Sequence, residues 1–197
     1  KKLDLKSINL LITELSRKYN LDITLDGLDK IKVERNDIQH IGFGNKSAPL
    51  SITIFSDYLC SHCKLFHEEL GNLVKKHPTL FYVEFRHFPI VQKLSSELAQ
   101  YGFCMDKQQK FLEYSDLIYE NQKSINSIKL TRLLETFEHD ANKLEVCLKS
   151  SIPARALDFD ISIAKKLGLA QTPTIILNGV ISDFKSINSA LSVLLKK

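Results

Sequence analysis

The fold is decided by residues 51–63, which read Ser-Ile-Thr-Ile-Phe-Ser-Asp-Tyr-Leu-Cys-Ser-His-Cys. The first six of them alternate Ile with Thr and Phe, and this period of two predicts a buried β-strand. Cys60 and Cys63 follow this strand closely. After Cys63, apolar residues recur at helical spacing. The helix is expected to end before Pro78, because a residue that precedes proline is displaced from the α region. The stretch therefore predicts a strand followed by a helix that begins at a pair of cysteines.

Outward from this stretch, strands alternate with helices. Residues 95–150 hold almost no Gly or Pro and keep apolar positions at helical spacing, which predicts a block of several helices. The remaining expected elements are a strand at 79–88, a helix at 154–167, a strand at 174–177 with a hairpin turn at Asn178-Gly179, and a helix from Phe184 to Leu194. Strand, helix and strand form a βαβ unit, so the fold class is α/β.

Residues 1–40 are expected to form an extension to the domain at 41–197. Spacings of three and four predict an amphipathic helix in the extension, and alternation of apolar with charged residues predicts an edge strand. The helix carries Leu5, Ile8, Ile12, Leu15 and Tyr19, and the strand carries Ile31 and Val33. Either this helix packs on its own domain or it joins copies of the chain into a homo-oligomer, since two heptads are marginal alone. Residues 42–49 are expected to form a turn-rich stretch.

The composition excludes several classes of protein. The chain has 197 residues, of which 44% are hydrophobic and 25% charged, as is typical of a domain with a buried core. No run of about 18 apolar residues occurs, so stable membrane insertion is not expected. The net charge of +4 comes mostly from Lys, and without clustered Arg and stacking aromatics nucleic-acid binding is not expected. The first residues, Lys1-Lys2, suggest that an export signal has already been removed.

The spacing of Cys60 and Cys63 indicates redox chemistry. At the start of a helix, unpaired N–H groups and the helix dipole favour the thiolate of Cys60, while Cys63 sits one turn inward. Cys60 is therefore the expected nucleophile and Cys63 the sheltered resolving thiol, the two closing a redox-active disulfide. His62 adds a donor or a partial positive charge beside the thiolate. Stabilising the reduced form makes the disulfide an oxidant, and no metal or organic cofactor is needed.

Three further interpretations of the pair are weaker. A zinc site needs a second close pair of ligands, but Cys104 and Cys147 are isolated in the helical block. Attachment of a c-type haem needs His directly after the second Cys, where this chain has Lys64. A purely structural disulfide at this spacing would be strained and easily reduced.

Several motifs together resemble the DsbA-like thiol-disulfide oxidoreductases. They are Gly44–Ala48, Phe55–Tyr58, Cys60-Ser61-His62-Cys63, Thr172-Pro173-Thr174 and Asn178-Gly179. The resemblance runs from about residue 42 to the C-terminus and implies a thioredoxin fold with a helical insertion at about 94–152. It also implies a cis peptide bond before Pro173, with the backbone of Thr172 beside the Cys60 sulfur to bind an extended substrate. From the residues alone, Pro173 could equally be an ordinary trans turn proline.

The chain departs from the family pattern at two positions near the motifs. Ser61 stands where the best-known oxidases have Pro, and Gln171 stands where relatives often have Gly. The extension resembles those of oligomeric relatives that act as disulfide isomerases.

These features favour a periplasmic or otherwise exported thiol-disulfide exchange enzyme, with isomerase slightly preferred over a DsbA-type dithiol oxidase. Its expected partners are unfolded or misoxidised proteins and a redox partner that recycles the site. The sequence is also compatible with a non-enzymatic peptide-binding or chaperone module and with a cytosolic reductase.

Some residues outside the motif yield expectations of their own. Cys104 and Cys147 are either free buried thiols or a structural disulfide, and the disulfide is favoured. Asp57 is expected to cap the helix that follows rather than to accept the proton of the sheltered thiol. His67, Glu68 and Glu69 are expected on a solvated or partly packed helix face.

Overall fold

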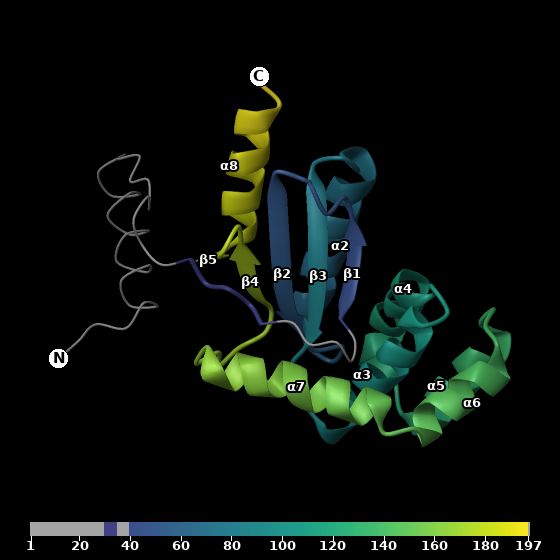
Figure 1. Cartoon of the computed structure of the whole chain (residues 1–197). Coiled ribbons are helices and arrows are strands. Elements are labelled where there is room, and N and C mark those ends of the chain that lie inside the picture. The colour runs from purple at the N-terminus through teal and green to yellow at the C-terminus, as the bar shows by residue number, and fades with distance from the viewer. Residues whose placement is uncertain (1–29, 35–39, 197) are drawn as a thin grey trace.

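The computed structural model describes residues 30–34 and 40–196, which include a five-stranded sheet with helices on both faces (Figure 1). The strands are β1 (Ile41–Gly44), β2 (Leu50–Ser56), β3 (Phe81–His87), β4 (Thr174–Leu177) and β5 (Val180–Ser182). The helices are α2 (Ser61–Lys76), α3 (Lys93–Asp106), α4 (Phe111–Asn121), the 3-10 helix η1 (Gln122–Ser124), α5 (Ser127–Thr136), α6 (Ala141–Lys149), α7 (Ile152–Lys166) and α8 (Phe184–Leu194).

The sheet has the order β1-β3-β2-β4-β5, with β2 at its centre. β2 pairs in parallel with β3 and antiparallel with β4, while β1 adds to β3 and β5 to β4, both antiparallel. In this register Ser56 lies opposite His87, and Phe55 lies opposite Thr174. Neighbouring strands therefore flank the C-terminal end of β2 on both sides. The loop that leads to Cys60 starts at this end.

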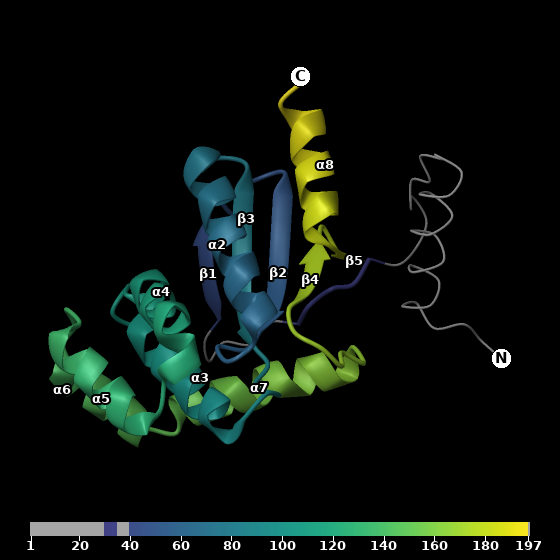
Figure 2. The same cartoon turned by 180° about the vertical axis from the view of Figure 1, so that it is seen from behind.

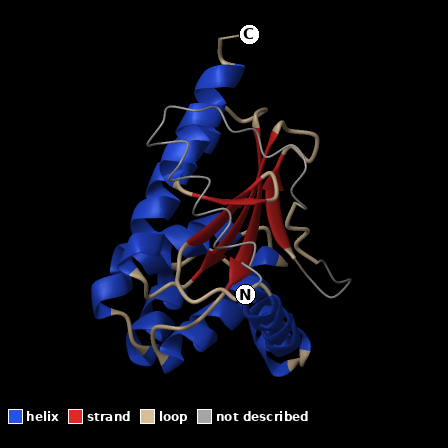
Figure 3. Cartoon of the chain, turned by 90° about the vertical axis from the view of Figure 1, so that its left-hand side faces the viewer, coloured by secondary structure: helices blue, strands red, loops and turns tan. Residues whose placement is uncertain are grey.

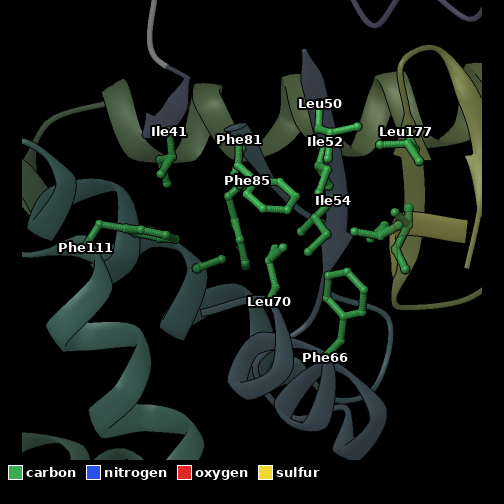
Figure 4. Packing of buried hydrophobic residues seen from close by; sticks show 14 of the residues in the cluster. Ile41, Leu50, Ile52, Ile54, Phe66, Leu70, Phe81, Phe85, Phe111 and Leu177 are labelled. Atoms are coloured by element: carbon green, nitrogen blue, oxygen red, sulfur yellow. The ribbon is translucent and has the colours of Figure 1, made fainter. Parts of the chain in front are cut away.

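The two faces of the sheet carry different helices. Phe66 and Leu70 of α2 and Ile187 of α8 pack with Ile52 and Ile54 in one buried cluster, part of which Figure 4 shows. Turning the molecule brings α2 in front of the strands, so α2 and α7 are seen on opposite sides of the sheet (Figures 1 and 2). The opposite cluster joins α7 to the sheet and contains Phe55, Phe88, Ile163, Ala164, Leu169 and Ile176. Both faces of the central strand are thus buried, since Ile52 and Ile54 belong to one cluster and Phe55 to the other.

The helices inserted between β3 and β4 build a core of their own beside the sheet. Buried residues of α3, α4, α5 and α6 pack with Tyr58, in the loop after β2, and with Cys63 in the first turn of α2. A disulfide between Cys104 of α3 and Cys147 of α6 crosses this core, with an S–S distance of 2.04 Å and a Cα–Cα distance of 5.7 Å. Figure 3 shows helices (blue) gathered at the lower end of the sheet (red), and Figure 1 labels α3, α4, α5 and α6 there.

A buried ionic cluster joins β3 to α7. Arg86 is fully buried and donates from Nη1 to Asp160 at 2.9 Å and from Nε to Glu84 at 2.9 Å. Asp160 also accepts the backbone N–H of His87 at 2.9 Å. The remaining guanidinium nitrogen donates to the backbone carbonyl of Glu34 at 3.0 Å. Each charge of the cluster is therefore paired, as burial requires.

The segment 30–34 is held against the domain. The backbone N–H of Ile31 donates to the carbonyl of Gly179 at 2.8 Å, and the carboxylate of Glu34 pairs with Lys166. Ile31 and Val33 pack against the cluster under α7. The edge strand predicted here is wrong, because the segment has no strand ladder and makes this single backbone bond to the hairpin.

The sequence-based α/β thioredoxin-fold prediction is confirmed, and the order of elements from 51 onward agrees with it. The turn-rich stretch at 42–49 is wrong in its first part, where β1 pairs with β3. Glycine has a low strand propensity, so the sequence does not indicate a strand here. Glycine is needed at both positions because β3 lies so close: a Cβ on Gly42 would lie 2.6 Å from the Tyr82 hydroxyl, and one on Gly44 would collide with the carbonyl of Phe81. The predicted helix at the start of the extension lies outside the described residues, so the boundary at residue 40 stays a prediction.

Candidate active site

Cys60 stands at the junction between β2 and α2. It is the N-cap residue of the helix, with extended backbone angles, and no side chain caps the helix there. Its thiol is free and its side chain is partly exposed. Because the first N–H groups of a helix have no partner within it, the Cys60 sulfur lies where a negative charge is stabilised. The position suits a nucleophilic thiolate.

Asp57 does not cap this helix, contrary to the sequence-based prediction. Its carboxylate is buried and accepts the backbone N–H groups of Leu59, Ile90 and Val91, each at 2.8 Å. The side chain therefore fastens the loop before Cys60 to the loop that follows β3. A buried carboxylate needs several donors, and Ile90 and Val91 in the loop after β3 supply two of the three that Asp57 has.

Cys63 lies one turn into the helix and is buried, with only 1% of its surface exposed. The backbone N–H of Asp57 approaches its sulfur at 3.5 Å. Burial raises the pKa of the Cys63 thiol to about 12, although hydrogen bonds from the Asp57 backbone and the Ser56 and Thr172 side chains act in the opposite direction. The two thiols thus differ in access, as expected of an attacking and a resolving cysteine.

The loop before β4 completes the site. The Thr172–Pro173 peptide bond is cis, as the family resemblance implies. The Cys60 thiol donates to the carbonyl oxygen of Thr172 at 3.2 Å, across 112 positions in the sequence. Both loop residues, Thr172 and Pro173, are half-buried.

The histidines near the motif lie in different surroundings. His62 is exposed on the first turn of α2, and among the described residues no hydrogen bond joins its ring to the Cys60 sulfur. His67 faces the insertion, where its Nε2 lies 2.6 Å from the carboxylate of Asp116 and its ring lies 4.8 Å from that of Tyr119. Glu68 is exposed and pairs with Lys64 at 3.8 Å. The face after the motif is therefore partly packed and partly solvated.

Residues that the sequence did not single out also support the site. Gln122 of η1 donates its side-chain amide to the carbonyls of Tyr58 and Cys60, at 2.7 and 2.9 Å. Ser56 and Tyr119 share a buried hydrogen bond of 2.9 Å beside Cys63. No spacing or periodicity in the sequence predicts these contacts, since each joins residues more than 60 positions apart.

Residues 30–34 and 40–196 hold neither a candidate metal site nor a membrane-spanning helix. They contain no cluster of three or more His, Cys, Asp or Glu side chains placed to hold a metal ion. Within the same ranges, no helix has the length and apolarity needed to cross a bilayer.

Comparison with known structures identifies the same architecture. The thiol-disulfide exchange protein alpha-DsbA2 of Wolbachia pipientis is 15% identical with a TM-score of 0.71, over 95% of this chain and 98% of that one. Oxidised BdbD of Bacillus subtilis is 19% identical with a TM-score of 0.68, over 86% and 100%. The catalytic domain of Proteus mirabilis ScsC is 20% identical with a TM-score of 0.68, over 82% and 92%. At these identities the likeness concerns the fold.

The amino-acid sequence shows the family of the chain. No curated protein matches the chain. A family model described as thioredoxin matches residues 36–197, which include both cysteines of the motif and the cis proline. The chain therefore belongs to the thioredoxin family, and it shares its fold with alpha-DsbA2, BdbD and the ScsC catalytic domain.

Proposed function

We propose that this chain exchanges disulfides in other proteins through Cys60, with Cys63 as the resolving thiol. The observation that carries the proposal is the 3.2 Å contact between the Cys60 thiol and the Thr172 carbonyl, because it links an accessible sulfur to backbone that can pair with an extended peptide. Thr172 and Pro173 guide the substrate. His62 tunes the Cys60 thiolate from the exposed first turn of the helix.

The substrates we propose are exported proteins that carry wrong disulfides, which makes the chain an isomerase. Support comes from the apolar seam of the extension, which favours association of copies and would let two active sites hold one misfolded protein. The contacts of residues 30–34 with Gly179, Arg86 and Lys166 support the same idea, since they fix the exit of the extension from the catalytic domain.

A second candidate is a dithiol oxidase that introduces disulfides. The position of Cys60 at the start of α2 favours it, because the helix dipole stabilises the thiolate and hence the reduced enzyme. His62 acts in the same direction. In either case a separate redox partner recycles the active site, and the family membership speaks for an enzyme rather than a peptide-binding module.

The compartment we propose is the periplasm or another exported location. The disulfide between Cys104 and Cys147 supports it, since such crosslinks persist in oxidising compartments and are rare in the cytosol of most organisms. A cytosolic reductase would be expected to lose this crosslink. Alkylation of the protein inside cells, followed by mass analysis, distinguishes the two: free thiols at both positions would contradict export.

The deciding experiment is reactivation of scrambled ribonuclease in a glutathione buffer, run beside oxidation of a reduced two-cysteine peptide. An isomerase should reactivate the ribonuclease strongly, and Cys60→Ala should abolish that activity. Fast oxidation of the peptide without reactivation would identify the oxidase instead. Binding of unfolded protein that is unchanged by Cys60→Ala, with no exchange in either assay, would support the non-enzymatic module.

A further inference from the structure

The last side chain of β2 lies between the resolving thiol and a phenol of the inserted helices. Ser56 is 3% exposed, and its hydroxyl lies 2.9 Å from the hydroxyl of Tyr119, which is 1% exposed. Next to Ser56 in the chain, the backbone N–H of Asp57 lies 3.5 Å from the Cys63 sulfur, and hydrogen bonding by the Ser56 side chain lowers the pKa of Cys63 against the larger effect of burial. Cys63 and Tyr119 belong to one buried cluster, and Ser56 bonds to Tyr119 beside it.

Either hydroxyl can donate in the bond between Ser56 and Tyr119, and the arrangement in which Tyr119 donates leaves the Ser56 proton available to Cys63. Burial raises the pKa of Tyr119 well above that of a free phenol, so this hydroxyl keeps its proton. Ser56 is its hydrogen-bond partner, and the phenol can therefore donate to the Ser56 oxygen. A serine hydroxyl has one proton and two acceptor positions. With its oxygen occupied by Tyr119, Ser56 is free to turn its own proton towards the Cys63 sulfur.

We propose that Ser56, held by Tyr119, is a positioning residue that stabilises the Cys63 thiolate whenever that sulfur carries charge during exchange. A buried thiolate without donors would be costly, and a hydrogen bond to a charged group is stronger than one to a neutral group. The inserted helices therefore contribute to the chemistry through Tyr119, besides covering the site.

The proposal applies to both directions of the reaction. When Cys63 resolves a mixed disulfide, its thiolate attacks the Cys60 sulfur, the Cys60–Cys63 bond forms and the bond from Cys60 to the substrate breaks. The proton lost by Cys63 balances the one taken up by the departing substrate thiolate. The dithiol loses two electrons and the substrate disulfide gains them. In reverse, a substrate thiolate attacks Cys60 and Cys63 leaves as the thiolate, again facing Ser56.

The chain contains a matched pair that separates this role from ordinary packing. Tyr58 and Ser115 also share a buried hydrogen bond of 2.9 Å in the same core, but neither hydroxyl contacts a thiol. Tyr114 lies on the same helix as Tyr119, is equally buried and donates to the carbonyl of Leu98 at 3.0 Å. Ser115→Ala and Tyr114→Phe therefore remove similar buried hydroxyls without touching the redox pair.

The test measures two steps separately: formation of a mixed disulfide at Cys60 and its resolution by Cys63. Reduced protein is mixed with excess oxidised glutathione and quenched with acid, and mass analysis gives the fractions of Cys60–glutathione adduct and of Cys60–Cys63 disulfide. Ser56→Ala should slow resolution by about tenfold to hundredfold, as expected for the loss of a hydrogen bond to a charged group, while formation of the adduct keeps its rate. Tyr119→Phe should slow resolution by about threefold to tenfold, because Ser56 loses its orientation. Ser115→Ala and Tyr114→Phe should remain near wild type.

A pH profile and a rescue distinguish a positioning role from a structural one. The Ser56→Ala resolution rate should match that of the wild type only at about one pH unit higher or more, as a tenfold loss requires. Ser56→Thr, which keeps the hydroxyl, should restore most of the rate. If Ser56→Ala unfolds, as circular dichroism would reveal, Tyr119→Phe decides.

The two ways to fail are distinguishable, although the inference rests on the proposed roles of Cys60 and Cys63. Wild-type protein that forms no glutathione adduct at Cys60 would overturn the proposed function and this inference with it. Normal exchange in the wild type, with wild-type resolution in Tyr119→Phe and in folded Ser56→Ala, would overturn this inference alone.

Discussion

The side-chain amide of Gln122 donates to the backbone carbonyl of Cys60 at 2.9 Å, although 62 positions separate the two residues. The same amide nitrogen donates to the carbonyl of Tyr58 at 2.7 Å. Gln122 begins the short 3-10 helix that follows α4, so the helical insertion holds the loop that carries Cys60. The insertion is therefore part of the active-site frame.

Replacing Gln122 with Ala should loosen this loop. The change removes two hydrogen bonds to neutral carbonyls, so we expect the free energy of unfolding to fall by about 1–2 kcal/mol. Exchange with a reduced peptide should slow severalfold, because Cys60 is less well positioned. The control is Asn121→Ala, since the Asn121 amide donates within its own helix to Leu117. Equal exchange rates in the two variants would contradict the assigned role.

His62 should raise the reduction potential of the Cys60–Cys63 couple. A positive or donating ring near the sulfur stabilises the reduced form, and His62→Ala should therefore make the couple more reducing. Because His62 is exposed, the effect is worth at most about 1 kcal/mol, which corresponds to roughly 20 mV. Equilibration with glutathione buffers measures it, and His139→Ala, remote in sequence, is the control. An unchanged or higher potential would remove His62 from the mechanism.

His87 should make the fold sensitive to acid. Its ring is buried among aromatic rings and its Nε2 has no hydrogen-bond partner among the described residues. Burial lowers the pKa of His87 to about 3, against 6.5 for a free side chain. Above pH 6.5 both folded and unfolded chains hold it neutral. Below that pH His87 is protonated in the unfolded chain but stays neutral in the folded chain. The free energy of unfolding therefore falls by up to about 1.4 kcal/mol per pH unit, down to about pH 3.

Urea unfolding at pH 7, 5 and 4 tests this, with His87→Phe as the variant. The variant should lose less stability between pH 7 and pH 4 than the wild type. Asp160 acts in the opposite direction, since burial raises its pKa to about 6 and the folded chain gains stability as pH falls through that value. The comparison between variant and wild type cancels this contribution. His77→Gln, at a position that is only half-buried, should keep the wild-type acid response.

Removing the disulfide between Cys104 and Cys147 should weaken the insertion. The two residues are 43 positions apart, and closing such a loop is worth about 4 kcal/mol by chain entropy. The double variant Cys104→Ala, Cys147→Ala should lose about 2–4 kcal/mol in urea unfolding while Cys60 is still alkylated at its normal rate. A loss of Cys60 reactivity as well would indicate that the crosslink also positions the active site.

The sequence predicted those parts of the molecule whose information is local. Alternation at 51–56 and the helical spacing after Cys63 depend on neighbouring residues alone, and so does the turn at Asn178-Gly179. β1 was missed because its two glycines carry no strand propensity and are required by close approach to β3.

The roles of the polar residues around the site depend on contacts between distant segments. Asp57 was interpreted as a helix cap because Ile90 and Val91, which supply two of its three donors, lie more than 30 positions away. The contacts of Gln122 and Tyr119 arise in the same way, from packing of the insertion. The sequence predicts which sulfurs react, but it does not indicate the distant residues that contact the site.

The four cysteines form two pairs, and each pair has one partly exposed and one buried member. Cys60 is partly exposed at a helix start, whereas Cys104 is completely buried and bonded to Cys147. A protein that exchanges disulfides, as we propose for this chain, works among reactive thiols, and its own crosslink is a potential target. Because Cys104 is buried in the helical core and Cys147 is partly exposed, an attacking thiol would reach this crosslink at Cys147.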